Sequence, residues 1–321
     1  MISTIRSGLA AAARLRKAVG VIYLCNLTIA AALTLPLFAL FHQKIGSLPA
    51  RAEMSSGFSY SWWSAFNFRA EGLAATIRPS LSGGFGPIFD NLELLLTGNW
   101  TTFGLSLFII AVLYVLLAAF FNGGAVALLV EEKPFSMQRF FSQAGHFFHH
   151  TAALAVTLML VFWGIYKGLA PLIFSLVDKI TAGSLSQPFI WAINLIGYLV
   201  LIKVIFTVTL IFDYARVLLI SEKKESSWLS IGHAALFVFR NWRAFLLNAL
   251  LVAFAVLLTL TAAALFSAVG STSVVTMIIV TLLQQVFMLL LIGMRLTFYA
   301  CEVVFYRSQL QAEQPIRKRK R

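Results

Sequence analysis

The chain has 321 residues, of which 60% are hydrophobic and 12% charged, and its mean hydropathy is +0.87. This composition excludes an ordinary water-soluble domain and is typical of a polytopic membrane protein. The formal net charge of +13 does not indicate a nucleic-acid partner, because no soluble module is present to carry such an interface.

Residues 1–18 are the first predicted element, a basic amphipathic segment. Arginines and a lysine alternate with apolar residues and alanines, a pattern typical of a helix that lies in the membrane interface. Basic residues favour the cytoplasmic leaflet, where anionic lipids are enriched.

Residues 19–41 form the first predicted span. The apolar stretch is longer than that of a signal peptide and includes Asn26 and Pro36, so we expect it to be retained. Cleavage near Ala50 or Ala52 is the alternative.

Residues 42–101 follow as an extracytoplasmic segment rich in aromatic residues. Aromatic side chains collect at bilayer interfaces. We therefore expect a cap or interfacial helices resting on the outer surface, with a lid or docking surface as the alternative.

The rest of the chain is predicted to form an all-α bundle. Six spans are expected at about residues 19–41, 102–130, 151–177, 188–220, 244–269 and 273–305, within a membrane domain of residues 19–306. The fourth exceeds the length that a span needs, which leaves an apolar overhang from Val217 to Ile220.

Six spans place both termini on one side of the membrane, and the charges indicate which side. Of the 25 Lys and Arg residues, 18 fall on the side of the termini, five on the other side, and Lys167 and Lys203 within spans. The positive-inside rule therefore predicts cytoplasmic termini. The basic tail, residues 307–321, ends in five consecutive cations that we expect to bind anionic lipid: Arg317, Lys318, Arg319, Lys320 and Arg321.

An internal repeat is indicated by a shift of 91 residues, which superposes the second and third spans on the fourth and fifth without a gap. Phe121 then meets Phe212, Asn122 meets Asp213, and Glu131 meets Glu222. Both copies cross the membrane in the same direction, so the repeat is parallel. In each copy the intervening loop is predicted to form an amphipathic helix on the cytoplasmic surface.

Lys203 is the first candidate functional residue. A rise of about 1.5 Å per residue places it roughly 22 Å into a span that begins at Pro188. An ionisable group at that depth is a functional hypothesis, and the alternative is a structural lysine whose stem reaches the interface.

A charge cluster is the second candidate site. Asp213 and Arg216 are three residues apart on one helix and can pair, and Arg295 and Glu302 enter at a similar level on the last span. The cluster is interpreted as a structural clamp between helices or as a gate or headgroup site. We also expect Asp213 to contact a basic group on another helix.

No cofactor or metal is predicted. His146 and His150 have the i, i+4 spacing of a ligand pair, but no third ligand is evident nearby. Sequence motifs of phosphate-binding loops, serine hydrolases and zinc peptidases are not found. No catalytic residue is assigned.

Short motifs resemble a loose group of six-span bacterial integral membrane proteins with no assigned activity. These motifs are Tyr23-Leu24-Cys25-Asn26-Leu27 with Pro36, Phe121-Asn122-Gly123-Gly124, and Phe212-Asp213-Tyr214-Ala215-Arg216. More distantly the chain looks like the membrane domain attached to some glycerophosphodiesterases. The resemblance implies a multi-pass protein of the bacterial inner membrane and transfers no residue role.

Three functions therefore stay open. The first is a non-enzymatic membrane scaffold or accessory subunit with an unidentified membrane protein partner. The second is a transporter or lipid-handling protein with a polar site near Lys203. The third is a membrane enzyme.

Overall fold

A computed structural model gives the architecture and describes residues 1–45, 60–68, 105–223, 226–269 and 273–319. These ranges contain helices and no strand. The helices are α1 (Ile2–Arg14), α2 (Arg16–Ile45), α4 (Tyr60–Phe68), α6 (Leu105–Glu131), α7 (Met137–Gly164), η4 (Ile165–Leu169), α8 (Ala170–Thr181), α9 (Gln187–Ser221), α10 (Ser227–Arg240), α11 (Trp242–Val269) and α12 (Val274–Arg319).

The predicted all-helical membrane architecture is confirmed in its coarse form. Five helical runs are long and apolar enough to cross a membrane, and α1 with α2, bent by 65° at their junction, is a sixth candidate. Most of the predicted segment 42–101, together with Lys320 and Arg321, lies outside the described residues.

The third predicted span differs from the structure at both ends. Residues 151–177 belong to one helical run from Met137 to Thr181, in which a π-helical turn, η4, joins α7 to α8. Before the π turn this run has no proline and no two adjacent glycines. The segment predicted as a polar link before residue 151 is therefore helical and continuous with the apolar residues that follow it. In the second half of the chain, Asn241 separates α10 from α11.

The predicted tail is helical over most of its length, because α12 continues to Arg319. This single helix therefore joins the last predicted span to the basic residues at the C-terminal end of the chain.

The core lies where the C-terminal parts of α6 and α9 meet the middle of α12. We call this core the hub and define it by Phe121–Leu129 of α6, Phe212–Ile220 of α9 and Leu296–Tyr306 of α12. All nine residues of 121–129 and all seven of 214–220 are buried. The apolar overhang of the fourth span is thus protein core.

Shorter helices surround the hub and complete its burial. The first half of α7 packs on α6, α10 packs on α9, and α1 lies across α12. Gly8 of α1 permits this crossing, because a Cβ atom there would lie 2.9 Å from the Cα of Cys301. Gly124 has the same role between α6 and α7, where a Cβ would lie 2.9 Å from the carbonyl oxygen of Phe140.

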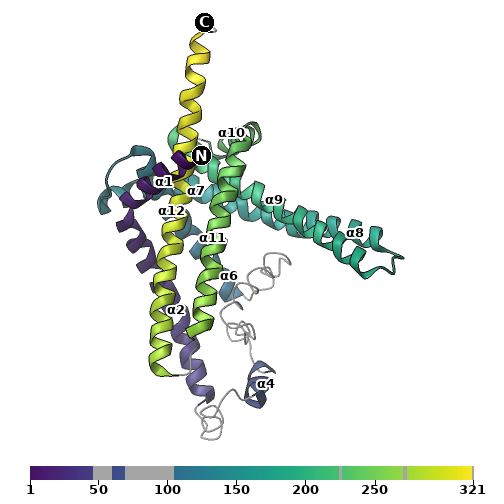
Figure 1. Cartoon of the computed structure of the whole chain (residues 1–321). Coiled ribbons are helices and arrows are strands. Elements are labelled where there is room, and N and C mark those ends of the chain that lie inside the picture. Colours follow the sequence, from purple (N-terminus) through teal and green to yellow (C-terminus); the bar gives the residue numbers. More distant parts are fainter. Residues whose placement is uncertain (46–59, 69–104, 224–225, 270–272, 320–321) are drawn as a thin grey trace.

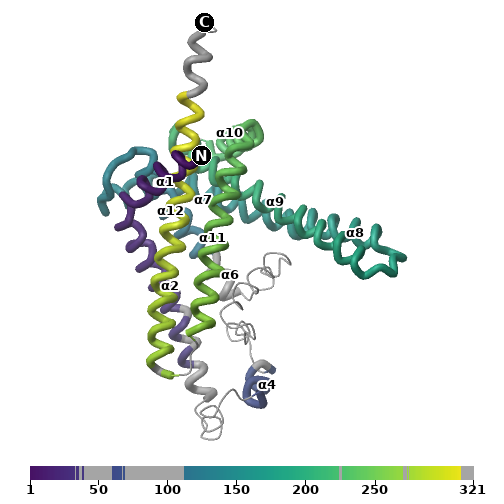
Figure 2. The backbone as a smooth tube through the Cα atoms, in the orientation of Figure 1, coloured from purple at the N-terminus to yellow at the C-terminus, as the bar shows by residue number. Residues whose placement is uncertain are grey.

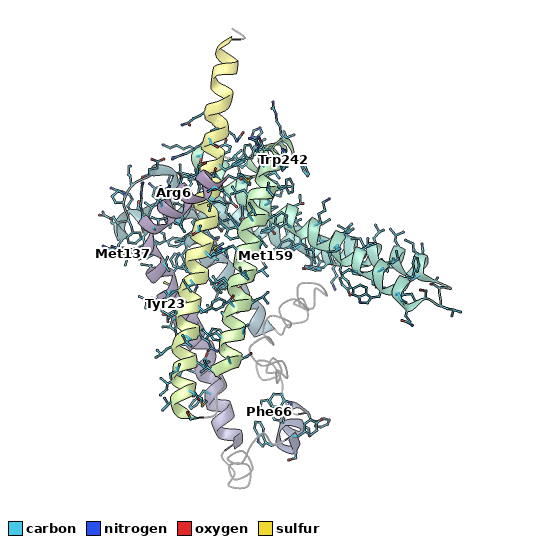
Figure 3. The ribbon with its side chains drawn as sticks, viewed as in Figure 1. Arg6, Tyr23, Phe66, Met137, Met159 and Trp242 are labelled. Atoms are coloured by element: carbon cyan, nitrogen blue, oxygen red, sulfur yellow. The ribbon has the colours of Figure 1, made fainter. Side chains whose placement is uncertain are left out.

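Outside the hub the helices spread apart (Figures 1 and 2). The lower parts of α2, α11 and α12 run side by side, and the Tyr23 hydroxyl of α2 donates to Gln285 of α12 at 2.9 Å (Figure 3). The N-terminal half of α9 pairs with α8 in a hairpin, the arm, that leads away from the hub in another direction. Apolar side chains along all these parts are exposed.

Candidate functional site: a buried charge cluster between α9 and α12

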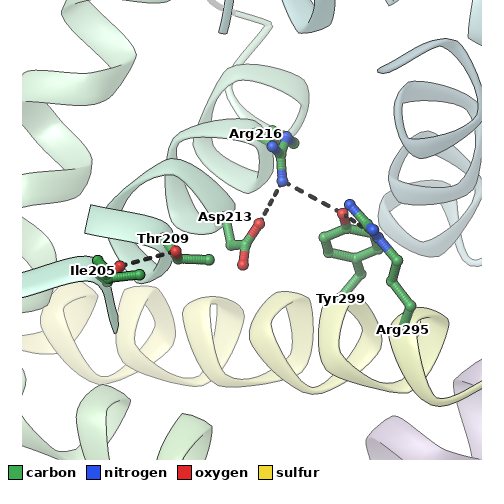
Figure 4. Close-up of polar contacts among 6 residues, drawn as sticks. All are labelled: Ile205, Thr209, Asp213, Arg216, Arg295 and Tyr299. Carbon is green, nitrogen blue, oxygen red and sulfur yellow. Dashed lines mark hydrogen bonds and ion pairs between the residues drawn. The ribbon is translucent and has the colours of Figure 1, made fainter. Parts of the chain in front are cut away.

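The polar centre of the hub lies where α9 meets α12. Asp213 and Arg216 share one face of α9 because they are three residues apart, and Arg295, Tyr299 and Glu302 share one face of α12 at spacings of four and three. These two faces approach each other in the hub (Figure 4).

Tyr299 connects the two arginines across the helix interface. Arg216 forms an ion pair with Asp213, and its Nη1 also donates to the Tyr299 hydroxyl at 3.4 Å. From the other side, Arg295 Nε donates to the same hydroxyl at 3.2 Å, and its guanidinium lies 5.9 Å from the ring centroid. A single phenol therefore accepts hydrogen bonds from both cations and links α9 to α12.

Glu302 is the most deeply buried charged residue of the cluster, with 1% of its surface exposed. Neither of its carboxyl oxygens has a hydrogen-bond partner within the described ranges, although it interacts electrostatically with Asp213, Arg216 and Arg295. The cluster holds two cationic and two acidic side chains, so its formal charges balance. Such balance limits the cost of taking charges out of water.

Aromatic rings pack against one another in the hub beside the cluster. The Tyr214 ring lies 5.1 Å from that of Phe237 and 6.5 Å from that of Phe305, and its buried hydroxyl has no hydrogen-bond partner within the described ranges. The cavities of about 610 and 170 Å³ beside α1 have no member of the cluster in their lining. The arrangement is suited to holding two helices together rather than to admitting a ligand.

The structure brings four of the five predicted site residues together and leaves the fifth apart. Lys203 is exposed on the arm, ten residues before Asp213, and lines neither cavity. Asp213 pairs with Arg216 of its own helix, so the expected direct contact with a cation of another helix is replaced by the link through Tyr299. Arg295 of α12 does act electrostatically on Asp213.

Tyr299 is the residue that the sequence analysis did not single out. Its position four residues after Arg295 and three before Glu302 places it on the same helical face, which is the signal that could have found it. The predicted tail residues are not part of this site: the backbone of Arg317, Lys318 and Arg319 is helical, and their side chains lie outside the described structure.

The three histidines that were considered as metal ligands, His146, His149 and His150, lie on α7, and His150 contacts α10. The rings of His149 and His150 are 3.7 Å apart, and the hydroxyl of Ser227 on α10 lies 3.4 Å from His150 Nδ1. Within the described ranges, no group of three His, Cys, Asp or Glu side chains is arranged to hold a metal ion.

Comparisons with known proteins find no match: no family model, no curated protein and no solved structure is similar enough to relate this chain to a family. A function is therefore inferred from the sequence and the structure of this chain only.

Proposed function

We propose that the protein is a non-enzymatic scaffold or accessory subunit of the bacterial inner membrane. The observation that carries this proposal is the charge cluster at the contact of α9 with α12, in which Arg216 and Arg295 both donate to Tyr299. Arg216 and Glu302 are buried and Arg295 is exposed, and aromatic and aliphatic side chains fill the hub around them. Such a cluster fixes the relative positions of α9 and α12. A binding or transport site needs a polar cavity instead.

The proposed topology has six spans with both termini in the cytoplasm. The excess of Lys and Arg on the side of the termini supports it, and the five or six candidate spanning elements agree with it in number. In this orientation the hub lies at the cytoplasmic end of the spans. Reporter fusions at Lys133, between α6 and α7, and at Ala182, between α8 and α9, test the proposal, because the former should report a cytoplasmic and the latter a periplasmic location.

The parallel repeat is part of the same proposal. Two residues with left-handed backbone, Glu132 (φ 56°) and Lys223 (φ 48°), end α6 and α9 and are 91 residues apart in the sequence. The buried runs Phe121–Leu129 and Phe212–Ile220 are related by the same shift. A duplicated helical hairpin accounts for both coincidences.

Transport is the second candidate function, and its requirement is a polar site near Lys203. The exposed position of Lys203 on the arm does not favour it. A membrane enzyme would need several ionisable groups that a substrate can reach. Arg216 and Glu302 of the charge cluster are buried, and Lys203 and the histidines lie on other parts of the structure, which argues against this third function.

Native mass spectrometry of the gently solubilised protein separates these functions, with wild type compared to Lys203→Met. A scaffold should retain a second polypeptide at a fixed ratio in both samples. A small molecule or lipid that is lost only from Lys203→Met would contradict the scaffold proposal and favour transport.

We further propose that the tail residues Arg317–Arg321 bind anionic lipid of the cytoplasmic leaflet. Deletion of these five residues should weaken binding to vesicles that contain phosphatidylglycerol, and the loss should shrink at high salt, because surface attraction is screened within about 10 Å at 0.1 M ionic strength. Equal binding with and without the tail would contradict this role.

A further inference from the structure

We propose that the corner between α1 and α2 forms a binding site for a phosphate group, in a cavity of about 610 Å³ between this corner and the loop that joins α6 to α7. Three cationic side chains line the cavity: Arg14, Arg16 and Lys17. The inference is independent of the scaffold proposal, since it concerns other residues and requires no protein partner.

The corner is held by apolar residues that point into the core. Leu15, between α1 and α2, is 1% exposed, and Ala18 is fully buried. The Leu15 N–H donates to the carbonyl oxygen of Ala12 at 2.9 Å and closes the last turn of α1. Because Leu15 and Ala18 occupy the core, the chain presents Arg14, Arg16 and Lys17 on the outer side of the bend, at the cavity wall.

The nearby acidic residues already have cationic partners. Glu132 lines the cavity and is paired with Arg307 of α12, whose guanidinium also donates to the Val130 carbonyl oxygen. Its neighbour Glu131 pairs with Lys133 at 3.0 Å. Among the described residues, Arg14, Arg16 and Lys17 form no ion pair of this kind. The cavity therefore presents three cations and one carboxylate, and that carboxylate is already paired with Arg307.

This charge pattern selects the ligand chemistry. Two guanidinium groups bind phosphate oxygens in a bidentate manner, and a lysine adds a third cationic donor. A cavity of this size accommodates a small organic phosphate. A second cavity of about 170 Å³ shares Arg14 and Glu132 and is otherwise lined mainly by apolar residues of α1, α6 and α12. The ligand is the phosphate of a lipid headgroup or a free phosphate compound.

The test uses the full-length protein in a zwitterionic detergent and measures binding of phosphatidic acid by native mass spectrometry. The site variant is Arg14→Gln/Arg16→Gln/Lys17→Gln. The matched control is Arg6→Gln/Arg240→Gln/Arg243→Gln, which removes the same charge from three exposed positions that do not line the cavity. Because one hydrogen bond to a charged group contributes about tenfold or more in affinity, the site variant should lose at least about 10-fold and the control less than about 2-fold.

Equal losses in the two triple variants would overturn the proposal, because they would indicate only diffuse attraction, and so would unchanged binding in both. If the site variant does not fold, the single variant Lys17→Gln is measured instead. A loss of about threefold or more in affinity for phosphatidic acid supports the site, and unchanged affinity overturns the proposal. Inorganic phosphate added as a competitor distinguishes the ligand sources. Displacement of the lipid at millimolar phosphate indicates a free phosphate ligand, and no displacement indicates a lipid headgroup.

Discussion

The hub and the parts that spread from it consist of the same residue types but face different surroundings. In α9, Leu219 of the hub is fully buried, whereas Leu199 of the arm is 54% exposed. Hydrophobic residues in the hub contact other side chains, whereas many of those in the arm, in α2 and α11 and in residues 275–290 of α12 are exposed. For a membrane protein the exposed surface faces lipid, so apolarity alone does not distinguish core from surface. The hub is distinguished from the parts exposed to lipid by the positions of its charged residues and by glycines that permit close contact between helices.

The largest effect is expected for the charge cluster. Arg216→Met leaves Asp213 buried without its partner, and breaking a buried pair in this way costs about 3–5 kcal/mol. Arg243→Met, an exposed position of α11, should change the free energy of unfolding by less than about 0.5 kcal/mol. Chemical unfolding in mixed micelles measures both. Equal stability of the two variants would mean that the cluster does not hold the hub together.

Truncation of a leucine in α9 should cost much more stability in the hub than in the arm. Leu219→Ala leaves a cavity in the hub and should cost about 2–5 kcal/mol. Leu199→Ala in the arm should cost less than about 1 kcal/mol, because lipid can fill the space. If Leu199→Ala were as destabilising as Leu219→Ala, the arm would be packed against protein in the membrane.

Close helix contacts in the hub should be sensitive to one added methyl group. Gly8→Ala places a Cβ too close to the backbone of Cys301, and overpacking of this kind costs about 1–3 kcal/mol. Gly20→Ala on α2 meets nothing within 4 Å and should stabilise the helix by up to about 1 kcal/mol. A thermal shift assay on both variants should show a lower melting temperature for Gly8→Ala and a higher one for Gly20→Ala. A stabilised Gly8→Ala would disprove the crossing of α1 over α12.

The smallest effect is expected at the end of α9. Lys223 has left-handed backbone (φ 48°), a conformation that glycine adopts without steric cost. Lys223→Gly should therefore raise the free energy of unfolding by about 0.5–1 kcal/mol, and Lys223→Ala should not. A destabilised glycine variant would argue against this conformation, and with it against one support for the repeat.

The helices and four members of the charge cluster could be predicted from the sequence. Long apolar runs predict spanning helices, and the spacing of Asp213 to Arg216 predicts their pairing. The hub could not be predicted, because α9 is apolar on every side and its sequence gives no sign of which turns contact protein and which contact lipid. Tyr299 was missed since a tyrosine near an interface is ordinary, and only the approach of α12 to α9 makes its hydroxyl a shared acceptor.

The cavity at the corner of α1 and α2 was missed for a different reason. Arg14, Arg16 and Lys17 were counted as evidence for topology, which is correct for any basic residues on the cytoplasmic side. Their common cavity depends on the bend at Leu15 and on a loop more than 100 residues later in the sequence. Pairing of Glu132 with Arg307 is a tertiary contact as well.

The central claim, that the charge cluster clamps α9 to α12, is tested most directly by a double-mutant cycle of Arg216→Met and Tyr299→Phe, because this pair joins the two helices. We predict a coupling energy of about 0.5–3 kcal/mol, since either substitution alone already removes the hydrogen bond across the interface. Additive losses in the double variant, or single variants as stable as wild type, would contradict the clamp.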